Sequence, residues 1–184
     1  MQFKTLAFLS ILSILFFTGC DSKNENKDRT EVKENKTNEK IITLKTTDNK
    51  NLNITIKDEK IIFKDYPNKI VLLNFFATWC APCKAEVPNL VSLQNTFKND
   101  FAVVSVLLEQ NKKNEEVIEF MNKYNINYQV TNSADNFIIS DALGGIKSIP
   151  TMFMIDKNSS VFQKYVGIVP FEMMEMDIKK LLVK

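Results

Sequence analysis

The order of apolar runs along the chain predicts alternating strands and helices. Two apolar stretches, residues 69–76 and 101–108, are typical of central strands that are buried on both faces of a sheet. Residues 41–46 and 52–56 alternate or are β-branched and flank a turn-prone DNKN segment, which predicts a β-hairpin ahead of the central strands. A further short strand is expected at 61–63.

Helical periodicity occurs between and after these strands. A helix is expected from about Ala81 to Lys98, with an interruption and a kink at Pro88 because proline removes one backbone donor. The methionines at 173, 174 and 176 are expected to fill the core rather than to bind a metal. The other predicted elements are a helix at 114–124, a short strand at 128–130, a short helix at 134–143, an antiparallel strand pair at 151–155 and 161–166, and a closing helix at 170–182.

Together these elements predict one α/β domain over residues 41–184, with a mixed central sheet. The chain has 184 residues, of which 45% are hydrophobic, enough for a single domain with a proper core. The net charge is +2 and no basic patch is interleaved with aromatic residues, so nucleic-acid binding is not expected.

The start of the chain has the features of an export signal. MQFK gives a short basic start, Thr5 to Phe17 are largely apolar, and TGC places small residues before the sulfur of Cys20. The thirteen apolar-rich positions cover roughly 20 Å as a helix, less than a bilayer core of about 30 Å. Residues 1–19 therefore resemble a bacterial lipoprotein signal peptide, which implies lipid on Cys20. Phe17 stands where that pattern usually has leucine, which leaves an ordinary cleaved signal or a retained membrane anchor open.

Residues 20–40 are expected to form a disordered polar tether. After Cys20 they contain six acidic side chains, six basic side chains and one apolar residue, Val32. Such a segment cannot bury enough surface to offset the entropy of ordering. Lipid and tether together would hold the folded domain at the periplasmic or extracytoplasmic face of a membrane. Cysteines there drift towards disulfides unless they are re-reduced.

The absence of histidine narrows the candidate chemistry. The chain contains none, which excludes Ser-His-Asp and Cys-His catalysis and disfavours most zinc and iron sites. The motif WCAPC, at the junction of a predicted strand and a predicted helix, supplies Cys80 and Cys83. This pair could hold a metal, form a structural disulfide or exchange electrons with other disulfides.

Redox exchange is the favoured interpretation of the pair. A closed zinc site needs four ligands, and a two-thiolate Cu(I) site remains the metal alternative. A disulfide between residues three apart closes too small a loop to stabilise the fold strongly. Cys80, by contrast, lies at a helix N-terminus, where free backbone N–H groups and the helix dipole favour the thiolate that attacks disulfides.

Cys80 is therefore expected to be the attacking residue. Cys83, one turn further into the helix, is expected to be more buried and to resolve the intermediate. Pro82 lacks an N–H, fits the first helical turn and stiffens the loop. Trp79 is expected either to cover the sulfur pair as an apolar shoulder or to be an ordinary core residue.

The motifs NFFATWCAPCKAEVP and SIPT resemble those of thioredoxin-fold proteins of the membrane-anchored, extracytoplasmic ResA/TlpA/CcmG group. The resemblance covers residue 41 to the C-terminus. It implies a thioredoxin fold with an N-terminal β-hairpin extension and a central helix-strand insert between Cys83 and Pro150. No cofactor and no metal are expected.

The resemblance also implies roles for residues away from the dithiol. Pro150 matches the cis-proline of this fold, in a turn that abuts the dithiol. The backbone of Ile149 is expected to pair with an extended client segment by strand addition. Gly167 matches a glycine that lets the client backbone approach the same face.

Glu86 is the expected proton carrier. It matches the acidic residue of the CxxCxxE pattern in the ResA-like group and lies three residues after Cys83 on the same helical face. Cytoplasmic thioredoxins carry a buried aspartate where this chain has Asn74, which cannot titrate. Partial burial would raise the pKa of Glu86 towards neutrality and let it carry the proton of Cys83. A solvent-facing glutamate is the alternative.

The expected function is that of a thiol:disulfide oxidoreductase that reduces client disulfides. The resemblance implies apocytochrome c, whose CxxCH motif must be reduced before haem attachment, as the leading client. It also implies a membrane electron donor of the DsbD/CcdA type. The alternatives are an oxidase or isomerase, a Cu(I) chaperone that uses the same two cysteines, and a non-catalytic interaction domain.

Overall fold

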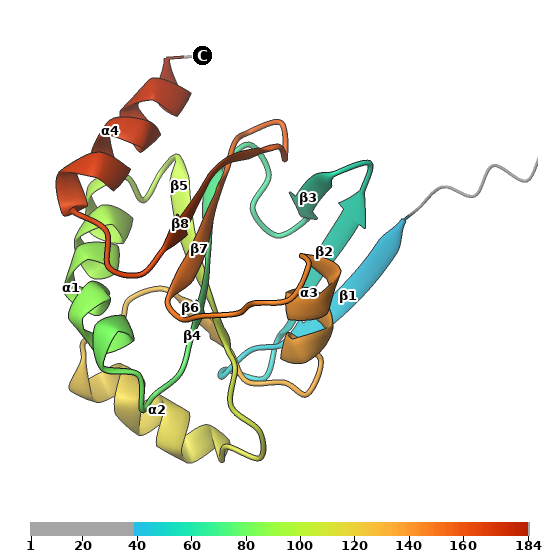
Figure 1. Cartoon of the computed structure of the whole chain (residues 1–184), viewed down its shortest axis with the longest axis vertical. Helices are drawn as coiled ribbons and strands as arrows, with labels where there is room; N and C mark the ends of the chain where they lie inside the picture. Colours follow the sequence, from blue (N-terminus) through green and yellow to red (C-terminus); the bar gives the residue numbers. More distant parts are fainter. Residues whose placement is uncertain (1–38, 184) are drawn as a thin grey trace, which may run out of the picture. The chain divides into compact units, whose positions relative to one another are not determined.

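A five-stranded mixed sheet forms the centre of the structure, a computed structural model that describes residues 39–183. Its strand order is β6-β5-β4-β7-β8, with β4 in the middle (Figure 1). The middle strand pairs in parallel with β5 and antiparallel with β7, which confirms the mixed sheet. The strands are β4 (Ile70–Phe76), β5 (Phe101–Leu107), β6 (Gln129–Thr131), β7 (Thr151–Ile155) and β8 (Val161–Val166).

β4 and β5 are the two central strands that their apolar sequences predict. Every residue of both strands is buried, as expected of strands covered on both faces. Side chains alternate between the two faces, so Leu72 belongs to one hydrophobic cluster and Leu73 to the other. Asn74 and Ser105 are the polar exceptions, and they lie opposite each other in the pairing of the two strands.

Three helices cover one face of this sheet. They are α1 (Ala81–Thr96), α2 (Asn114–Lys123) and α4 (Phe171–Leu182), and Figure 1 shows them on one side of the strands. Leu90 of α1, Val117 of α2 and Ile178 of α4 share a hydrophobic cluster with Leu72. Between β5 and α3, α2 and β6 form the predicted helix-strand insert.

A second sheet and a short helix cover the opposite face. The strands β1 (Lys40–Lys45), β2 (Asn51–Lys57) and β3 (Lys60–Phe63) form an antiparallel sheet in that order. The helix α3 (Asn136–Ala142) lies beside this sheet (Figure 1). Leu44, Ile54 and Ile139 pack in one cluster with Phe75 of β4. The predicted N-terminal hairpin is confirmed, and it continues into the short strand expected at 61–63.

Two expectations for the helices are wrong. α1 continues through Pro88 to Thr96 without an interruption, because proline withdraws a single backbone donor and this one lies on the exposed side of the helix. Met174 is buried, but Met173 and Met176 are exposed. The two exposed methionines are three residues apart and so share the outer face of α4.

The predicted signal segment 1–19, the lipidation site Cys20 and the tether up to residue 38 lie outside the described residues. β1 begins at Lys40, one residue ahead of the predicted start of the domain, which is within the usual variation of element ends. Within residues 39–183, the helices are all too short or too polar to cross a bilayer.

Candidate active site

The two cysteines of the WCAPC motif lie where the central strand β4 leads into α1. The strand ends at Phe76 and the helix begins at Ala81, so Cys80 is the capping residue. The backbone N–H of Cys83 donates a hydrogen bond to Sγ of Cys80, with 3.1 Å between nitrogen and sulfur. The sulfur thus satisfies one of the free donors of the first turn. Pro82 lies in that turn, where its missing N–H is not needed.

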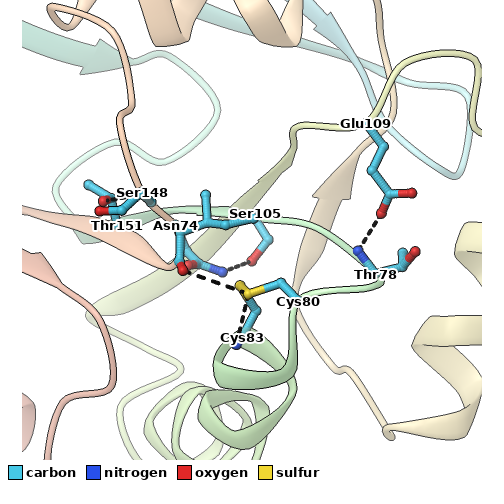
Figure 2. The surroundings of a disulfide bond; sticks show 9 residues. Asn74, Thr78, Cys80, Cys83, Ser105, Glu109, Ser148 and Thr151 are labelled. Atoms are coloured by element: carbon cyan, nitrogen blue, oxygen red, sulfur yellow. Dashed lines mark hydrogen bonds between the residues drawn. A yellow bond between two sulfur atoms is a disulfide. The ribbon is translucent and has the colours of Figure 1, made fainter.

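Cys80 and Cys83 form a disulfide (Figure 2). They are 3% and 4% exposed, respectively, so the expectation that Cys83 is the more buried of the two is wrong in this oxidised form. The turn ahead of β7 explains the shielding of Cys80, because the carbonyl oxygen of Ile149 lies 3.7 Å from its Sγ. Both sulfur atoms are therefore largely shielded from solvent.

The turn that shields Cys80 is tied to the end of β8. The peptide bond between Ile149 and Pro150 is cis, as the resemblance implies. The backbone N–H of Gly167 donates to the carbonyl oxygen of Pro150 at 2.8 Å. Gly167 has a φ of +83°, and a Cβ added there would meet no atom within 4 Å. The space beside this glycine is open, and its use by a client backbone stays a prediction, as does strand addition at Ile149.

Trp79 lies on the surface next to the disulfide. It is 68% exposed, which excludes the alternative that it is an ordinary core residue. Its predicted role as an apolar cover for the sulfur pair stays a prediction.

An acidic residue that the sequence did not single out supports the loop between β4 and α1. The backbone N–H of Thr78 donates to Oε1 of Glu109 (Figure 2). Oε2 of Glu109 lies 4.0 Å from Nζ of Lys112. Glu109 follows β5, and parallel neighbouring strands end at the same edge of a sheet. That placement is the signal in the sequence from which the contact could have been inferred.

Glu86 is buried, at 1% exposed, which excludes the solvent-facing alternative. The backbone N–H of Val169 donates to its Oε2 at 3.0 Å, and Nδ2 of Asn89 donates to its Oε1 at 3.3 Å. Burial raises the pKa of the Glu86 carboxyl, and these two hydrogen bonds oppose that rise. The direction of the shift agrees with the expected proton carrier, although the role itself stays a prediction.

Cytoplasmic thioredoxins have an aspartate where this chain has Asn74, and the polar side chains around Asn74 are neutral. Nδ2 of Asn74 donates to Oγ of Ser105 at 2.9 Å (Figure 2), and Tyr128 is a buried neighbour of this pair. Oδ1 of Asn74 is buried and has no hydrogen-bond partner among the described residues. Burial is the main cause that raises the pKa of Tyr128. Glu86, rather than Asn74, is thus the titratable side chain among these residues whose pKa burial raises from the ordinary carboxyl value.

Metal-ligating side chains are dispersed among the residues that the structure describes. Within residues 39–183, no three side chains of histidine, cysteine, aspartate or glutamate are grouped so that they could hold an ion. The two-thiolate Cu(I) alternative concerns the reduced form of Cys80 and Cys83 and stays a prediction.

These observations define a class of protein. A mixed sheet carries a dithiol at the junction of its central strand and a helix, and the dithiol faces a cis-proline turn. This is the arrangement of a thioredoxin-fold protein with a redox-active disulfide.

Comparison with known proteins narrows the class. The model of the AhpC/TSA family matches residues 37–164. The thiol-disulfide oxidoreductase ResA of Bacillus thuringiensis (strain Al Hakam) is 32% identical over 126 residues, which cover 68% of this chain and 71% of ResA. The thioredoxin-like protein YneN of Bacillus subtilis (strain 168) is 30% identical over 125 residues, 67% of this chain and 72% of YneN.

Solved structures agree with the sequence relatives. The crystal structure of a thioredoxin-family thiol:disulfide interchange protein from Chlorobium tepidum TLS aligns with a TM-score of 0.60 at 27% identity, over 77% of this chain and 93% of that one. The chain belongs to the AhpC/TSA family and, within it, to the ResA/TlpA/CcmG group of thiol:disulfide oxidoreductases.

Proposed function

We propose that this oxidoreductase is anchored by lipid on Cys20 at the extracytoplasmic face of a membrane and that it reduces disulfides in client proteins. The lipoprotein-like segment 1–19 and the polar tether 20–40 support the anchor and the location. The observation that carries the thiol–disulfide exchange is the capping of α1 by Cys80, and the resemblance to the ResA/TlpA/CcmG group supports the reductive direction. Because its sulfur accepts the Cys83 N–H at 3.1 Å at the positive end of a helix, the thiolate of the reduced form is favoured there.

Reduction of a client proceeds through two thiol–disulfide exchanges. The Cys80 thiolate attacks one sulfur of the client disulfide, forms a mixed disulfide and releases the other client sulfur as a thiolate. Cys83 then gives up its proton and attacks Sγ of Cys80, which releases the second client thiolate and closes the Cys80–Cys83 disulfide. Two electrons pass from the dithiol to the client, whose thiolates take up protons from water.

Glu86 is the proposed acceptor of the Cys83 proton. It is three residues after Cys83 on α1, and burial raises the pKa of its carboxyl towards the range in which it can accept and return a proton. The neutral Asn74 leaves no second carboxyl at the position where cytoplasmic thioredoxins have one.

The resemblance to the ResA/TlpA/CcmG group supports the choice of partners. The leading client is apocytochrome c, whose CxxCH thiols must be reduced before haem is attached. A membrane electron donor of the DsbD/CcdA type would return electrons to the oxidised pair.

Trapping of mixed disulfides tests this function. Cys83→Ala removes the resolving thiol, so client proteins are expected to accumulate as covalent adducts on Cys80. The adducts are isolated from the membrane fraction of cells under non-reducing conditions and identified by mass spectrometry. The control is Cys80→Ala with Cys83→Ala, which is expected to trap nothing on this site.

Three outcomes would contradict parts of the proposal. If no adduct forms on Cys80, the chain does not act on protein disulfides. If the trapped proteins are cytosolic, or the chain is absent from the membrane fraction, the proposed location is wrong. If apocytochrome c is absent among the adducts in cells that make cytochrome c, the proposed client is wrong.

A further inference from the structure

Asn89 connects two parts of the site. It lies on α1, three residues after Glu86, and is half-buried. Its Nδ2 lies 3.3 Å from Oε1 of Glu86 and 3.4 Å from the carbonyl oxygen of Val169. Both partners are acceptors, which orients the amide with its nitrogen towards them. None of the sequence motifs assigns a function to this asparagine.

The Glu86 carboxylate also holds the segment between β8 and α4, residues 167–170, here called the β8–α4 segment. The N–H of Val169 donates to Oε2 of Glu86 at 3.0 Å, and the N–H of Gly167 donates to the carbonyl oxygen of Pro150 at 2.8 Å. The β8–α4 segment is therefore attached to the cis-proline turn at one end and to α1 further along.

We propose that Asn89 is a positioning residue that holds Glu86 in its ionised form and fastens the β8–α4 segment to α1. The proton on Glu86 and the attachment of this segment then change together. The proposal rests on the proposed role of Glu86 as the proton acceptor.

The physical reason is the strength of charge-assisted hydrogen bonds. An ionised carboxylate accepts stronger hydrogen bonds than the neutral acid does. When Glu86 receives the proton of Cys83, its bonds from Val169 and Asn89 weaken, and the β8–α4 segment is held less firmly. Because coupling between two binding events is reciprocal, a client that contacts this segment changes the proton affinity of Glu86.

Within residues 39–183, the donors that hydrogen-bond to the Glu86 carboxylate are Asn89 and the Val169 N–H, and neither is ionisable. The β8–α4 segment has the sequence Gly-Ile-Val-Pro and contains no ionisable side chain. Ahead of β6, Tyr128 is close enough to be affected by the Glu86 charge: its pKa is raised first by burial and further by that charge. On α1 itself the neighbouring groups are the sulfur pair and Lys84, which is partly exposed.

An NMR titration of the full chain tests the proposal. The Glu86 carboxyl resonance is assigned by its loss in Glu86→Gln. Asn89→Ala removes a donor to the ionised form, so it is expected to raise the titration midpoint of Glu86 by roughly half to one pH unit. Asn89→Asp, of nearly the same size, replaces the donor by a like charge and is expected to raise the midpoint further. The matched control is Ser92→Ala, at an exposed position of α1, which is expected to leave it unchanged.

The backbone amide of Val169 provides a second readout. The chemical shift of this amide is expected to titrate with the same midpoint as the Glu86 carboxyl. In Asn89→Ala both midpoints are expected to shift to higher pH. Circular dichroism establishes that each variant is folded. An unchanged Glu86 midpoint in both Asn89 variants overturns the proposal, and so does a Val169 amide that does not respond to pH across the Glu86 titration.

Reduction of insulin, with dithiothreitol as the reductant, separates this inference from the proposed function. In Asn89→Ala, the rising limb of the pH–rate profile is expected to shift to higher pH. In a Glu86→Gln background the same substitution is expected to cause no further movement, and a movement that persists there counts against the proposal. If the wild-type chain does not reduce insulin at all, the proposed reductase function fails, whereas the NMR titration still decides the role of Asn89.

Discussion

At the scale of single residues, the reactivity expected of Cys80 comes from the main chain and not from a neighbouring base. The chain has no histidine, and the group that contacts Sγ at 3.1 Å is the backbone N–H of Cys83. Such a donor stays in place in any protonation state of the side chains around it. The pH dependence of the exchange is therefore expected to come from the two thiols and from Glu86.

Replacement of Glu86 by glutamine is expected to slow exchange and to stabilise the fold at higher pH. The variant keeps an acceptor for the Val169 N–H but cannot take the proton of Cys83. For stability, the folded protein binds more protons than the unfolded chain between the ordinary pKa of 4.5 and the raised value. The free energy of unfolding therefore falls as pH rises through that window, and the loss persists above it.

Two measurements check this prediction. Thermal unfolding is expected to give a higher Tm for Glu86→Gln than for wild type above the raised pKa, with the difference shrinking as the pH falls below 4.5. The rate of insulin reduction is expected to fall in the same variant without loss of secondary structure. Wild-type exchange rates across mildly acidic to mildly alkaline pH would rule out the proton-carrier role.

At the scale of elements, α4 is attached to β8 by a buried polar contact. The hydroxyl of Tyr165 donates to Oδ2 of Asp177 at 2.7 Å, and Lys180 donates to Oδ1 at 3.0 Å. Burial and the neighbouring carboxylate both raise the pKa of Tyr165, so the phenol remains a donor. This contact fixes the helix that follows the β8–α4 segment.

Tyr165→Phe is expected to destabilise the protein by about 1–3 kcal/mol, because it leaves a buried carboxylate oxygen without its donor. Urea unfolding measures the change. Tyr124→Phe, at the end of α2, keeps its ring contacts with Phe120 and is the control, expected to stay within about 0.5 kcal/mol of wild type. Equal effects of the two substitutions would contradict the importance of the Tyr165–Asp177 contact.

Strands and helices are predictable from the sequence where the pattern that specifies them lies in neighbouring residues. The apolar runs of β4 and β5 and the cysteine at the start of α1 are readable from neighbouring letters. The faces of α4 are also predictable from helical phase: Met173 and Met176 are three residues apart and share one face, whereas Met174 lies on another. Residue type alone predicts all three methionines in the core, whereas helical phase predicts that only one face of α4 is buried.

The contacts that complete the site were not predictable in this way. Glu86 and Val169 are 83 residues apart in the chain, and Thr78 and Glu109 are 31 apart. No local pattern pairs Glu86 with Val169, since that pairing depends on how α1 meets the segment after β8. The Thr78–Glu109 contact could be inferred only from the edge at which the parallel strands β4 and β5 both end. The shielding of Cys80 is not predictable from neighbouring residues either, because the carbonyl group that covers its sulfur belongs to Ile149, 69 residues later in the chain.

At the scale of the whole described domain, the two cysteines and the second sheet lie on opposite faces of the five-stranded sheet. Ile54 of β2 is fully buried in the cluster between the two sheets. Ile54→Ala is expected to cost about 2–5 kcal/mol of stability, because it removes buried methyl groups and leaves a cavity. The reduction potential of the dithiol, on the other face, is expected to remain unchanged.

Ile41→Ala is the matched control. Ile41 lies in β1 of the same small sheet but is exposed, so its truncation is expected to change stability by less than about 0.5 kcal/mol. Chemical denaturation gives the stability of both variants, and equilibration with glutathione buffers gives their potentials. A shift in potential for a folded Ile54→Ala would show that the second sheet influences the dithiol after all.

The burial of both sulfur atoms makes the oxidised protein a discriminating electron acceptor. A small thiol that collides with the surface at random is expected to reduce the disulfide only slowly, at the high concentrations and long equilibration of an assay, since Cys80 is 3% exposed. A protein donor that displaces the carbonyl of Ile149 from above Sγ opens the bond to attack. We therefore expect a protein donor that fits this surface to reduce the disulfide faster than small thiols do.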